Sequence, residues 1–295
     1  MGRRRFLQLS AMAGLATACG GQAEVPLQVV GLFSSDRVIA AGRPQRVPFG
    51  LVADSSLELA DDVPLQVTIR FGEETVERLG VVGRVVSHDH DPGVGEEPHE
   101  HANLLRYYAL RTTFPEAGIY DLEIEVEGRT ASLPVQAFDP SEISLPLTGE
   151  PFPVLATPTL DDAMGVDPVC TLFDGPCPYH TRSAADVLAN GEPMALLVAT
   201  PAFCQTSYCG PVLTTLIEAA TDFDSIVMVH VEPWANPTEG SGLSDPGLRT
   251  APTIDALALT FEPALFLVDR NGIIVERIDN VFDASELRAA LATIS

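Results

Sequence analysis

The sequence predicts two domains, an all-β sandwich over residues 24–139 followed by an α/β domain over residues 159–295. Two patterns favour this fold class. In the first half, apolar and polar residues alternate with a period of two, which is typical of strands that have one face in a core and the other in water. In the second half, short apolar runs alternate with segments of helical spacing. Five prolines within residues 140–158 predict a semi-rigid linker between the domains.

The composition is acidic and contains no lysine. The chain has 41 Asp and Glu residues against 17 basic residues, all of them Arg, which gives a net charge of −24. A protein of this sign repels nucleic acid and anionic membrane surfaces, so DNA and RNA binding are excluded as function classes. The absence of lysine also excludes a Schiff-base mechanism and a phosphate-binding loop that needs lysine.

Strand patterns follow one another through the first domain without a helix-length interruption. Residues 65–71 and 120–126 show the clearest alternation. Turn residues separate these from further strand candidates at 25–33, 46–53, 76–87, 104–114 and 130–138. About seven short strands in this length predict a sandwich.

Residues 116–122, Glu-Ala-Gly-Ile-Tyr-Asp-Leu, resemble the turn into a late strand of immunoglobulin-like domains, where a tyrosine anchors the corner. The matching residue here is Tyr120. The Cys…Trp…Cys core of antibody domains is missing from this segment. The resemblance therefore implies an immunoglobulin-like architecture, with a spacer or scaffold role for the first domain.

The second domain alternates strand and helix patterns. Apolar runs at 194–200 and 226–231 predict buried strands, and the helical spacing of 210–221 predicts a helix between them. A further helix is expected over 253–259. The Asn271-Gly272 pair is a strong hairpin signal between strands at 264–268 and 273–278. Asp283 and Glu286 have the spacing of a capping box before a last helix.

The N-terminus has the layout of an export signal. Arg3, Arg4 and Arg5 precede an uncharged apolar stretch, so residues 1–18 are expected to be removed and are too short to span a bilayer. The segment resembles a twin-arginine signal, which implies export in the folded state. Residues 15–19 also resemble a lipoprotein box, in which Cys19 is lipidated; ordinary cleavage after Ala18 is the alternative. We expect a lipid anchor at the extracytoplasmic face of the membrane, the alternative being a periplasmic or secreted protein.

The four remaining cysteines form two local pairs. Outside the cytoplasm, disulfide formation is the default for such pairs. A turn at 174–176 separates Cys170 from Cys177, and we expect a structural disulfide there. Cys204 and Cys209 lie between a predicted buried strand and the start of a helix, where a helix N-terminus favours a thiolate. This second pair is the candidate redox site, and a permanent structural disulfide is the alternative.

Residues 159–295 resemble the thioredoxin superfamily. The order β-α-β-α-β-β-α is that of its fold, and two motif alignments compete. Residues 208–212 are similar to the thioredoxin sequence Trp-Cys-Gly-Pro-Cys, with Val212 in place of the second cysteine. Cys204 and Cys209 instead resemble the cysteine pair of Sco-type copper chaperones, although four residues rather than three separate them. Residues 229–233 and 266–272 are similar to later Sco segments, but the Sco copper-binding histidine is missing.

Residues 262–264 resemble the cis-proline segment of thioredoxin and TlpA-like reductases, which makes Pro263 the candidate cis proline. The resemblance implies a membrane-anchored thiol–disulfide oxidoreductase. In it Cys204 is the nucleophile and Cys209 the resolving thiol, and the thioredoxin alignment reverses these roles. The implied partners are exported protein thiols or a membrane electron donor. A non-catalytic surface lipoprotein with two structural disulfides is a further alternative.

A cluster of histidines predicts a metal site in the first domain. Side chains two residues apart share one face of a strand, so His88 with His90 and His99 with His101 converge if the segment forms a hairpin. Imidazoles bind Zn²⁺ or Cu²⁺, which adds a Sco-like metallochaperone or a metal-binding lipoprotein to the candidate functions. The alternative is a solvated acidic loop. His180 and His230 stand alone in the sequence and are interpreted as ordinary side chains.

The lipid anchor has a direct test. Replacing Cys19 by Ser removes the sulfur to which lipoprotein processing attaches lipid, so the variant should move from the membrane to the soluble fraction. Fractionation followed by immunoblotting measures the change. Membrane attachment equal to that of the wild type would contradict lipidation at Cys19.

Overall fold

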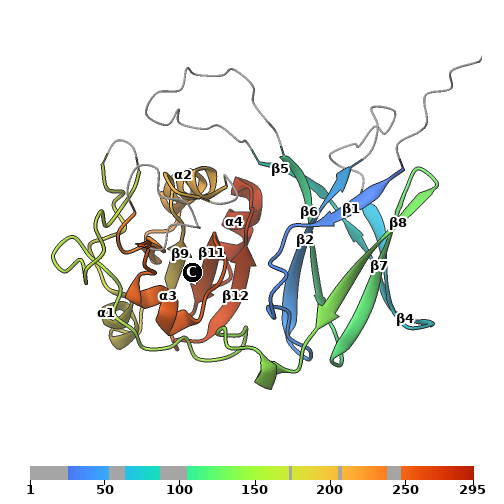
Figure 1. The fold of residues 1–295 in the computed structure, drawn as a ribbon, viewed down its shortest axis with the longest axis horizontal. Helices are drawn as coiled ribbons and strands as arrows, with labels where there is room; N and C mark the ends of the chain where they lie inside the picture. The colour runs from blue at the N-terminus through green and yellow to red at the C-terminus, as the bar shows by residue number, and fades with distance from the viewer. Residues whose placement is uncertain (1–25, 53–63, 87–104, 173–174, 205–207, 238–246) are drawn as a thin grey trace, which may run out of the picture.

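The computed structural model describes residues 26–52, 64–86, 105–172, 175–204, 208–237 and 247–295. Within them the chain forms three four-stranded sheets (Figure 1). Two sheets belong to the first part of the chain and the third to the second part. The predicted signal segment, Cys19 and the four clustered histidines lie outside the described residues. No helix in the described part of the chain is long and apolar enough to cross a membrane.

The first part of the chain packs two antiparallel sheets face to face. One sheet has the order β1-β2-β6-β5, with β1 at Gln28–Gly31, β2 at Pro44–Val52, β6 at Leu105–Thr113 and β5 at Gly83–Val86. The other has the order β4-β3-β7-β8, with β4 at Glu74–Val81, β3 at Leu65–Phe71, β7 at Gly118–Val126 and β8 at Arg129–Ala137. Alternate apolar residues of both sheets fill one core, among them Phe49, Leu110, Ile69 and Leu122.

The third sheet has the order β10-β9-β11-β12, with β9 at Met194–Val198, β10 at Val227–Val231, β11 at Ala264–Val268 and β12 at Ile274–Asp279. β9 and β10 are parallel, whereas β11 runs antiparallel to both β9 and β12. All five residues of β9 and of β11 are buried, as expected for strands covered on both faces. The carboxyl ends of β9 and β10 therefore meet at one edge of the sheet.

In the described residues, four short helices accompany this sheet: α1 (Ala184–Ala189), α2 (Cys209–Ala220), α3 (Pro252–Leu257) and α4 (Ala284–Leu291). A 3₁₀ turn, η1, spans Pro140–Glu142. α2 and α4 pack against each other and share a core with β9 and β11. α1 is the one described helix that the helical spacing of the sequence did not predict.

The predicted fold class, an immunoglobulin-like sandwich followed by an α/β thioredoxin-like fold, is wrong for this chain. The described residues are mostly β, with three sheets against four helices of which only α2 exceeds eight residues. Long stretches between the strands, such as the residues from 143 to 183, contain no helix in the described part. The periodicity of the sequence predicted most individual strands and helices. The described residues between the strands, however, form long loops where an α/β fold would have helices.

Two local predictions are confirmed. The Tyr120 hydroxyl donates to the Glu116 carbonyl at 2.9 Å and accepts from the Glu116 N–H at 3.2 Å, so this tyrosine anchors its corner. The Asn271-Gly272 pair joins β11 to β12 as a hairpin, and Gly272 has a φ of 76°. Glycine adopts this left-handed conformation without the steric cost that a side chain would add.

The proline-rich segment 140–158 packs against the third sheet. Its apolar side chains Leu145, Leu147 and Phe152 are buried. Its backbone pairs with the β11–β12 hairpin, because Phe152 N–H donates to Gly272 O and Ile274 N–H donates to Glu150 O. The segment thereby adds buried contacts between the two parts of the chain.

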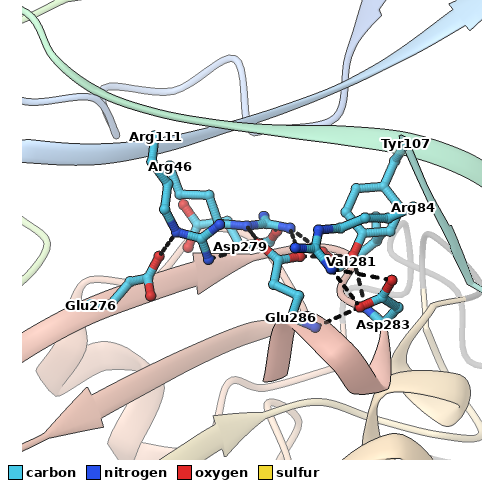
Figure 2. Close-up of polar contacts among 9 residues, drawn as sticks. All are labelled: Arg46, Arg84, Tyr107, Arg111, Glu276, Asp279, Val281, Asp283 and Glu286. Carbon is cyan, nitrogen blue, oxygen red and sulfur yellow. Dashed lines mark hydrogen bonds and ion pairs between the residues drawn. The ribbon is translucent and has the colours of Figure 1, made fainter. Parts of the chain in front are cut away.

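A buried ion pair joins the first part of the chain to the third sheet. Arg46 on β2 donates from Nε and Nη2 to the two carboxylate oxygens of Glu286 on α4, at 2.8 and 2.9 Å (Figure 2). Both side chains are 1% exposed. Two further donors of Arg46 bond the carbonyls of Asp279 and Val281. Because all four of these hydrogen bonds cross between the two parts, the guanidinium helps to fix their relative position.

Tyr107 on β6 completes this network. Its hydroxyl donates to Glu286 at 2.7 Å and accepts from the backbone N–H of Asp283 at 2.8 Å. Asp283 caps α4 as predicted, since its side chain accepts from the Glu286 N–H. In a complete capping box, the Glu286 carboxylate would also accept from the backbone N–H of Asp283. Here that N–H donates to Tyr107, and the Glu286 carboxylate faces Arg46, Arg111 and Tyr107 (Figure 2).

Electrostatics keep Glu286 ionised inside the interface. Burial alone raises the pKa of Glu286, but the charge and hydrogen bonds of Arg46, with help from Arg111 and Tyr107, outweigh it and lower the pKa to about 2. Relative to an ordinary value of 4.5, this shift corresponds to about 3 kcal/mol of stability. A lowered pKa stabilises the fold above pH 4.5, and the contribution is lost as the pH falls through 2.

This interface predicts an acid-sensitive stability. Glu286→Gln leaves Arg46 buried without a counter-charge, so the free energy of unfolding at pH 7 should fall by about 3–5 kcal/mol. The variant should also lose the part of the wild-type pH dependence that lies between pH 5 and 2. Urea titrations over this pH range measure both effects.

The exposed pair of Arg288 with Asp222 supplies the control. Asp222→Asn should change the free energy of unfolding little. Equal effects of the two variants would contradict a dominant buried pair.

Candidate functional site

Two groups of sulfur-containing side chains lie near the carboxyl ends of β9 and β10. The first group is the redox pair, Cys204 and Cys209. Cys204 lies in the turn after β9, and Cys209 is the first residue of α2. Their Sγ atoms lie 2.6 Å apart and are recorded as thiols rather than as a disulfide. The backbone N–H of Cys209 donates to the Cys204 sulfur at 3.3 Å, which stabilises negative charge on that sulfur.

The two cysteines of the redox pair differ in burial. Cys209 is fully buried, whereas Cys204 is partly exposed. Burial raises the pKa of Cys209 well above its usual range, and the hydrogen bond with Cys204 and the negative charges of Cys204 and Glu262 add to the effect. Cys209 therefore keeps its proton while Cys204 is the sulfur that solvent and a substrate can reach.

Glu262 lies beside the redox pair, and Pro263 follows it immediately before β11. The Glu262 carboxylate oxygen lies within 4.8 Å of both sulfurs, and the side chain is buried. The Glu262–Pro263 peptide bond is cis, as predicted for Pro263. The Pro263 carbonyl accepts from the Asn280 N–H at 2.9 Å, which ties this segment to the end of β12.

The second group is the Cys₂His₂ group, which consists of Cys170, Cys177, His180 and His230. All four side chains are buried, and one ligand atom from each lies within 4.8 Å of the other three. Such a group could hold a metal ion. His230 comes from β10, the edge strand of the third sheet, and the other three residues come from the segment that crosses this edge. The backbone N–H of His230 donates to Tyr179 O and holds that segment in place.

His230 is the centre of the Cys₂His₂ group. Its Nδ1 lies 3.0 Å from His180 Nε2, 3.4 Å from Cys177 Sγ and 3.7 Å from Cys170 Sγ. Its Nε2 lies 2.9 Å from Ala199 O, a carbonyl that can only accept, so Nε2 carries a proton. Backbone N–H groups also reach the sulfurs, from Cys177 to Cys170 and from Tyr179 to Cys177.

The Cys₂His₂ group favours one thiolate even without an ion. Hydrogen bonds from Cys177, and then from the two histidines, lower the pKa of Cys170 against the effect of burial. The hydrogen bond to Cys170 and burial raise the pKa of Cys177. Burial is also the main cause that lowers the pKa of His180. A low-pKa thiolate beside an imidazole with an available lone pair is the donor set that a transition metal takes.

A hydrogen-bond network connects the two groups. Thr171 follows Cys170 and accepts from the Ala202 N–H at 3.1 Å, two residues before Cys204. Its hydroxyl also lies 3.3 Å from the Thr200 hydroxyl and donates to Glu232 at 2.8 Å. Burial raises the pKa of Glu232 to about 7, although His230 and the threonine hydrogen bonds oppose the shift. The segment of the Cys₂His₂ group therefore supports the turn that carries Cys204.

Several predictions about site residues differ from the structure. Cys170 and Cys177 are thiols whose sulfurs face His230, and not the disulfide that the turn between them suggested. His180 and His230 are not isolated side chains, since their rings lie together at 4.8 Å between centroids. The predicted histidine cluster, His88, His90, His99 and His101, lies outside the described residues. The spacing Cys170-x₆-Cys177-x₂-His180 was the sequence signal available for the Cys₂His₂ group.

A cleft of about 790 Å³ lies elsewhere, between the first part of the chain and β12. Its lining includes Arg46, Arg111, Glu276, Arg277 and Asp279. These charges pair with one another or with Glu286 across the interface. We therefore interpret this cleft as part of the contact between the two halves rather than as the reactive site.

Comparison with family models and with curated proteins finds no match for this chain. The argument for function therefore depends on the geometry and chemistry of the two groups.

The unequal burial of Cys204 and Cys209 predicts unequal reactivity. In the reduced, folded protein, iodoacetamide at pH 7 should modify Cys204 first, because Cys209 is buried and holds its proton. Cys209 should react at a comparable rate only after unfolding. Peptide mapping by mass spectrometry measures the modified fraction at each cysteine over time. Faster modification of Cys209 in the folded protein would instead support the alignment that makes it the nucleophile.

Proposed function

We propose that this chain is a thiol–disulfide oxidoreductase that uses Cys204 and Cys209. The observation that carries the proposal is the pairing of a reachable sulfur with a buried one at the start of α2. A nucleophilic thiolate must be exposed to its substrate, and a resolving thiol must lie within bonding distance of it. Glu262 and Pro263 complete the surroundings of the pair.

The proposed reaction has two exchange steps. The Cys204 thiolate attacks one sulfur of a substrate disulfide, which forms a mixed disulfide and releases the other substrate sulfur as a thiolate. Cys209 then loses its proton to the nearby Glu262 carboxylate and attacks the Cys204 sulfur. The second substrate sulfur leaves as a thiolate and takes the proton held by Glu262, and the first released thiolate takes a proton from water. The substrate disulfide is reduced to two thiols, and Cys204 and Cys209 are oxidised to a disulfide; the reverse sequence oxidises a dithiol.

The proposed setting is the extracytoplasmic face of the cell membrane. The arginine-rich start of the chain and Cys19 support export and a lipid anchor. The substrates proposed for such a location are the thiols and disulfides of exported proteins, with a membrane electron donor as the alternative partner. The high negative charge disfavours nucleic acid as a partner.

Metal binding is the second candidate function. The observation that favours it is the Cys₂His₂ group, in which thiolate and imidazole donors suit Zn²⁺ or copper. A chaperone must release its ion to a partner, so its ligands need access to solvent. The four ligands of this group are at most 9% exposed. Burial therefore favours retention of an ion over transfer, and thiol–disulfide exchange remains the leading proposal.

The redox function is tested with oxidised glutathione as the probe. Cys209→Ser removes the resolving thiol, so the mixed disulfide between Cys204 and glutathione should accumulate. Cys204→Ser should form no stable adduct. Intact-mass spectrometry after acid quenching counts the adduct. Peptide mapping of the adduct is the control, and it should find glutathione on Cys204 and none on Cys170 or Cys177.

The reduction potential separates a catalytic pair from a structural disulfide. A catalytic Cys204–Cys209 pair should equilibrate with glutathione buffers at about −120 to −270 mV, whereas structural disulfides lie below about −300 mV. Adduct formation by neither variant, together with a potential below about −300 mV, would overturn the proposed function.

A further inference from the structure

We propose that Cys170, Cys177, His180 and His230 bind one Zn²⁺ in a closed tetrahedral site. The inference does not depend on the redox function, because it uses different residues and a different chemistry. Four donors from two distant segments meet in the interior, and all of them belong to the residue types that zinc prefers.

The three separations measured from His230 Nδ1 are close to those of a tetrahedron around zinc. With Zn–S bonds of about 2.3 Å and Zn–N bonds of about 2.05 Å, neighbouring ligand atoms lie roughly 3.3–3.8 Å apart. The sulfurs of Cys170 and Cys177 lie 3.7 and 3.4 Å from His230 Nδ1, and the two histidine nitrogens lie 3.0 Å apart. A shift of a few tenths of an ångström in one imidazole brings all three separations into this range.

The orientation of the His230 ring also points to an ion. A zinc-bound histidine usually donates its other N–H to a carbonyl or carboxylate, which fixes the ring. The His230 Nε2 contact with Ala199 O supplies this bond and directs Nδ1 at the other three donors. Nδ1 of His230 offers one lone pair or one proton, which can serve only one of its three neighbours, whereas one cation among them would bind all four ligand atoms. His180 contacts His230 through Nε2, which makes Nε2 the nitrogen available to an ion. In the described residues, the other ring nitrogen of His180, Nδ1, has no hydrogen-bond partner.

Charge and geometry together select zinc over copper. Two thiolates and two neutral imidazoles carry a charge of −2, which Zn²⁺ cancels. Cu⁺ would leave a net negative charge in the interior, and burial of an uncompensated charge is costly. Cu²⁺ carries the same charge as Zn²⁺ but takes square-planar or tetragonal sites rather than a tetrahedron. The S₂N₂ tetrahedral set is itself typical of zinc. With four protein ligands and no exposed side of the group, the site has the form of a structural rather than a catalytic centre.

The bound ion would fasten the segment that crosses β10 onto the third sheet. Three ligands come from this segment and one from the strand that it covers. Because Thr171 follows Cys170 and bonds the Ala202 N–H, the same ion would hold the turn before Cys204. Coordination would also prevent a Cys170–Cys177 disulfide, since both sulfurs would be bound as thiolates.

Metal analysis of the purified full-length chain tests the proposal. After dialysis against buffer without metal, inductively coupled plasma mass spectrometry should find about one zinc per chain in the wild type. Cys170→Ser/Cys177→Ser should contain none. Two controls should keep the full zinc content: the quadruple variant His88→Ala/His90→Ala/His99→Ala/His101→Ala, which removes the other predicted metal site, and Cys204→Ser/Cys209→Ser, which removes the redox pair. A circular dichroism spectrum shows whether each variant folds.

A spectroscopic measurement on the wild type keeps the test valid if the cysteine variant does not fold. After exchange of the bound ion for Co²⁺, the protein should show a thiolate-to-cobalt charge-transfer band and the intense visible bands of a tetrahedral site. A cobalt spectrum without the thiolate band would overturn the proposal. So would a wild type that contains no metal, or zinc that is lost with the histidine cluster and retained without Cys170 and Cys177. Because the glutathione assay reads only Cys204 and Cys209, failure of the redox proposal is detected separately.

Discussion

The arrangement of the molecule depends on one guanidinium that has almost no contact with water. Arg46 is buried against α4, and its charge is tolerated there only because Glu286 and two backbone carbonyls accept its hydrogen bonds. The bidentate geometry leaves little freedom in the position of α4 relative to β2. α4 in turn packs against α2, whose first residue is Cys209. The ion pair thereby positions the redox pair from a different layer of the structure.

The first part of the chain also contributes directly to the surroundings of the redox pair. Tyr208, which precedes Cys209, packs against Val86 and Tyr107 at the ends of β5 and β6 and against Val281. Tyr107 belongs to the ion-pair network as well, because its hydroxyl bonds Glu286 (Figure 2). One sheet of the first part therefore packs against the residue that precedes Cys209.

Periodicity in the sequence was sufficient to place most strands and helices, but not to predict the fold class or the buried Cys₂His₂ group. The alternation at 65–71 matches β3 because a sheet with one buried face imposes that pattern on local sequence. The fold class depends on how many residues lie in loops rather than in helices, and no local pattern in the sequence predicts that number. His180 and His230 are separated by fifty residues, and their contact depends on a segment that crosses the edge of β10. That crossing is held by long-range bonds such as His230 N–H to Tyr179 O, which a single sequence does not reveal.

Burial assigns different chemistry to the two sulfur-containing groups at the ends of β9 and β10. Where one sulfur is partly exposed and the other buried, as in Cys204 and Cys209, a substrate can reach the first and the second can complete the exchange. Where both sulfurs are buried with two imidazoles, no substrate disulfide can enter, and a small cation is the partner that fits. Thr171 joins the groups through Thr200 and Ala202, so the Cys₂His₂ group supports the turn before Cys204. If both proposals hold, a bound ion would help to position the attacking sulfur of Cys204 without taking part in the exchange.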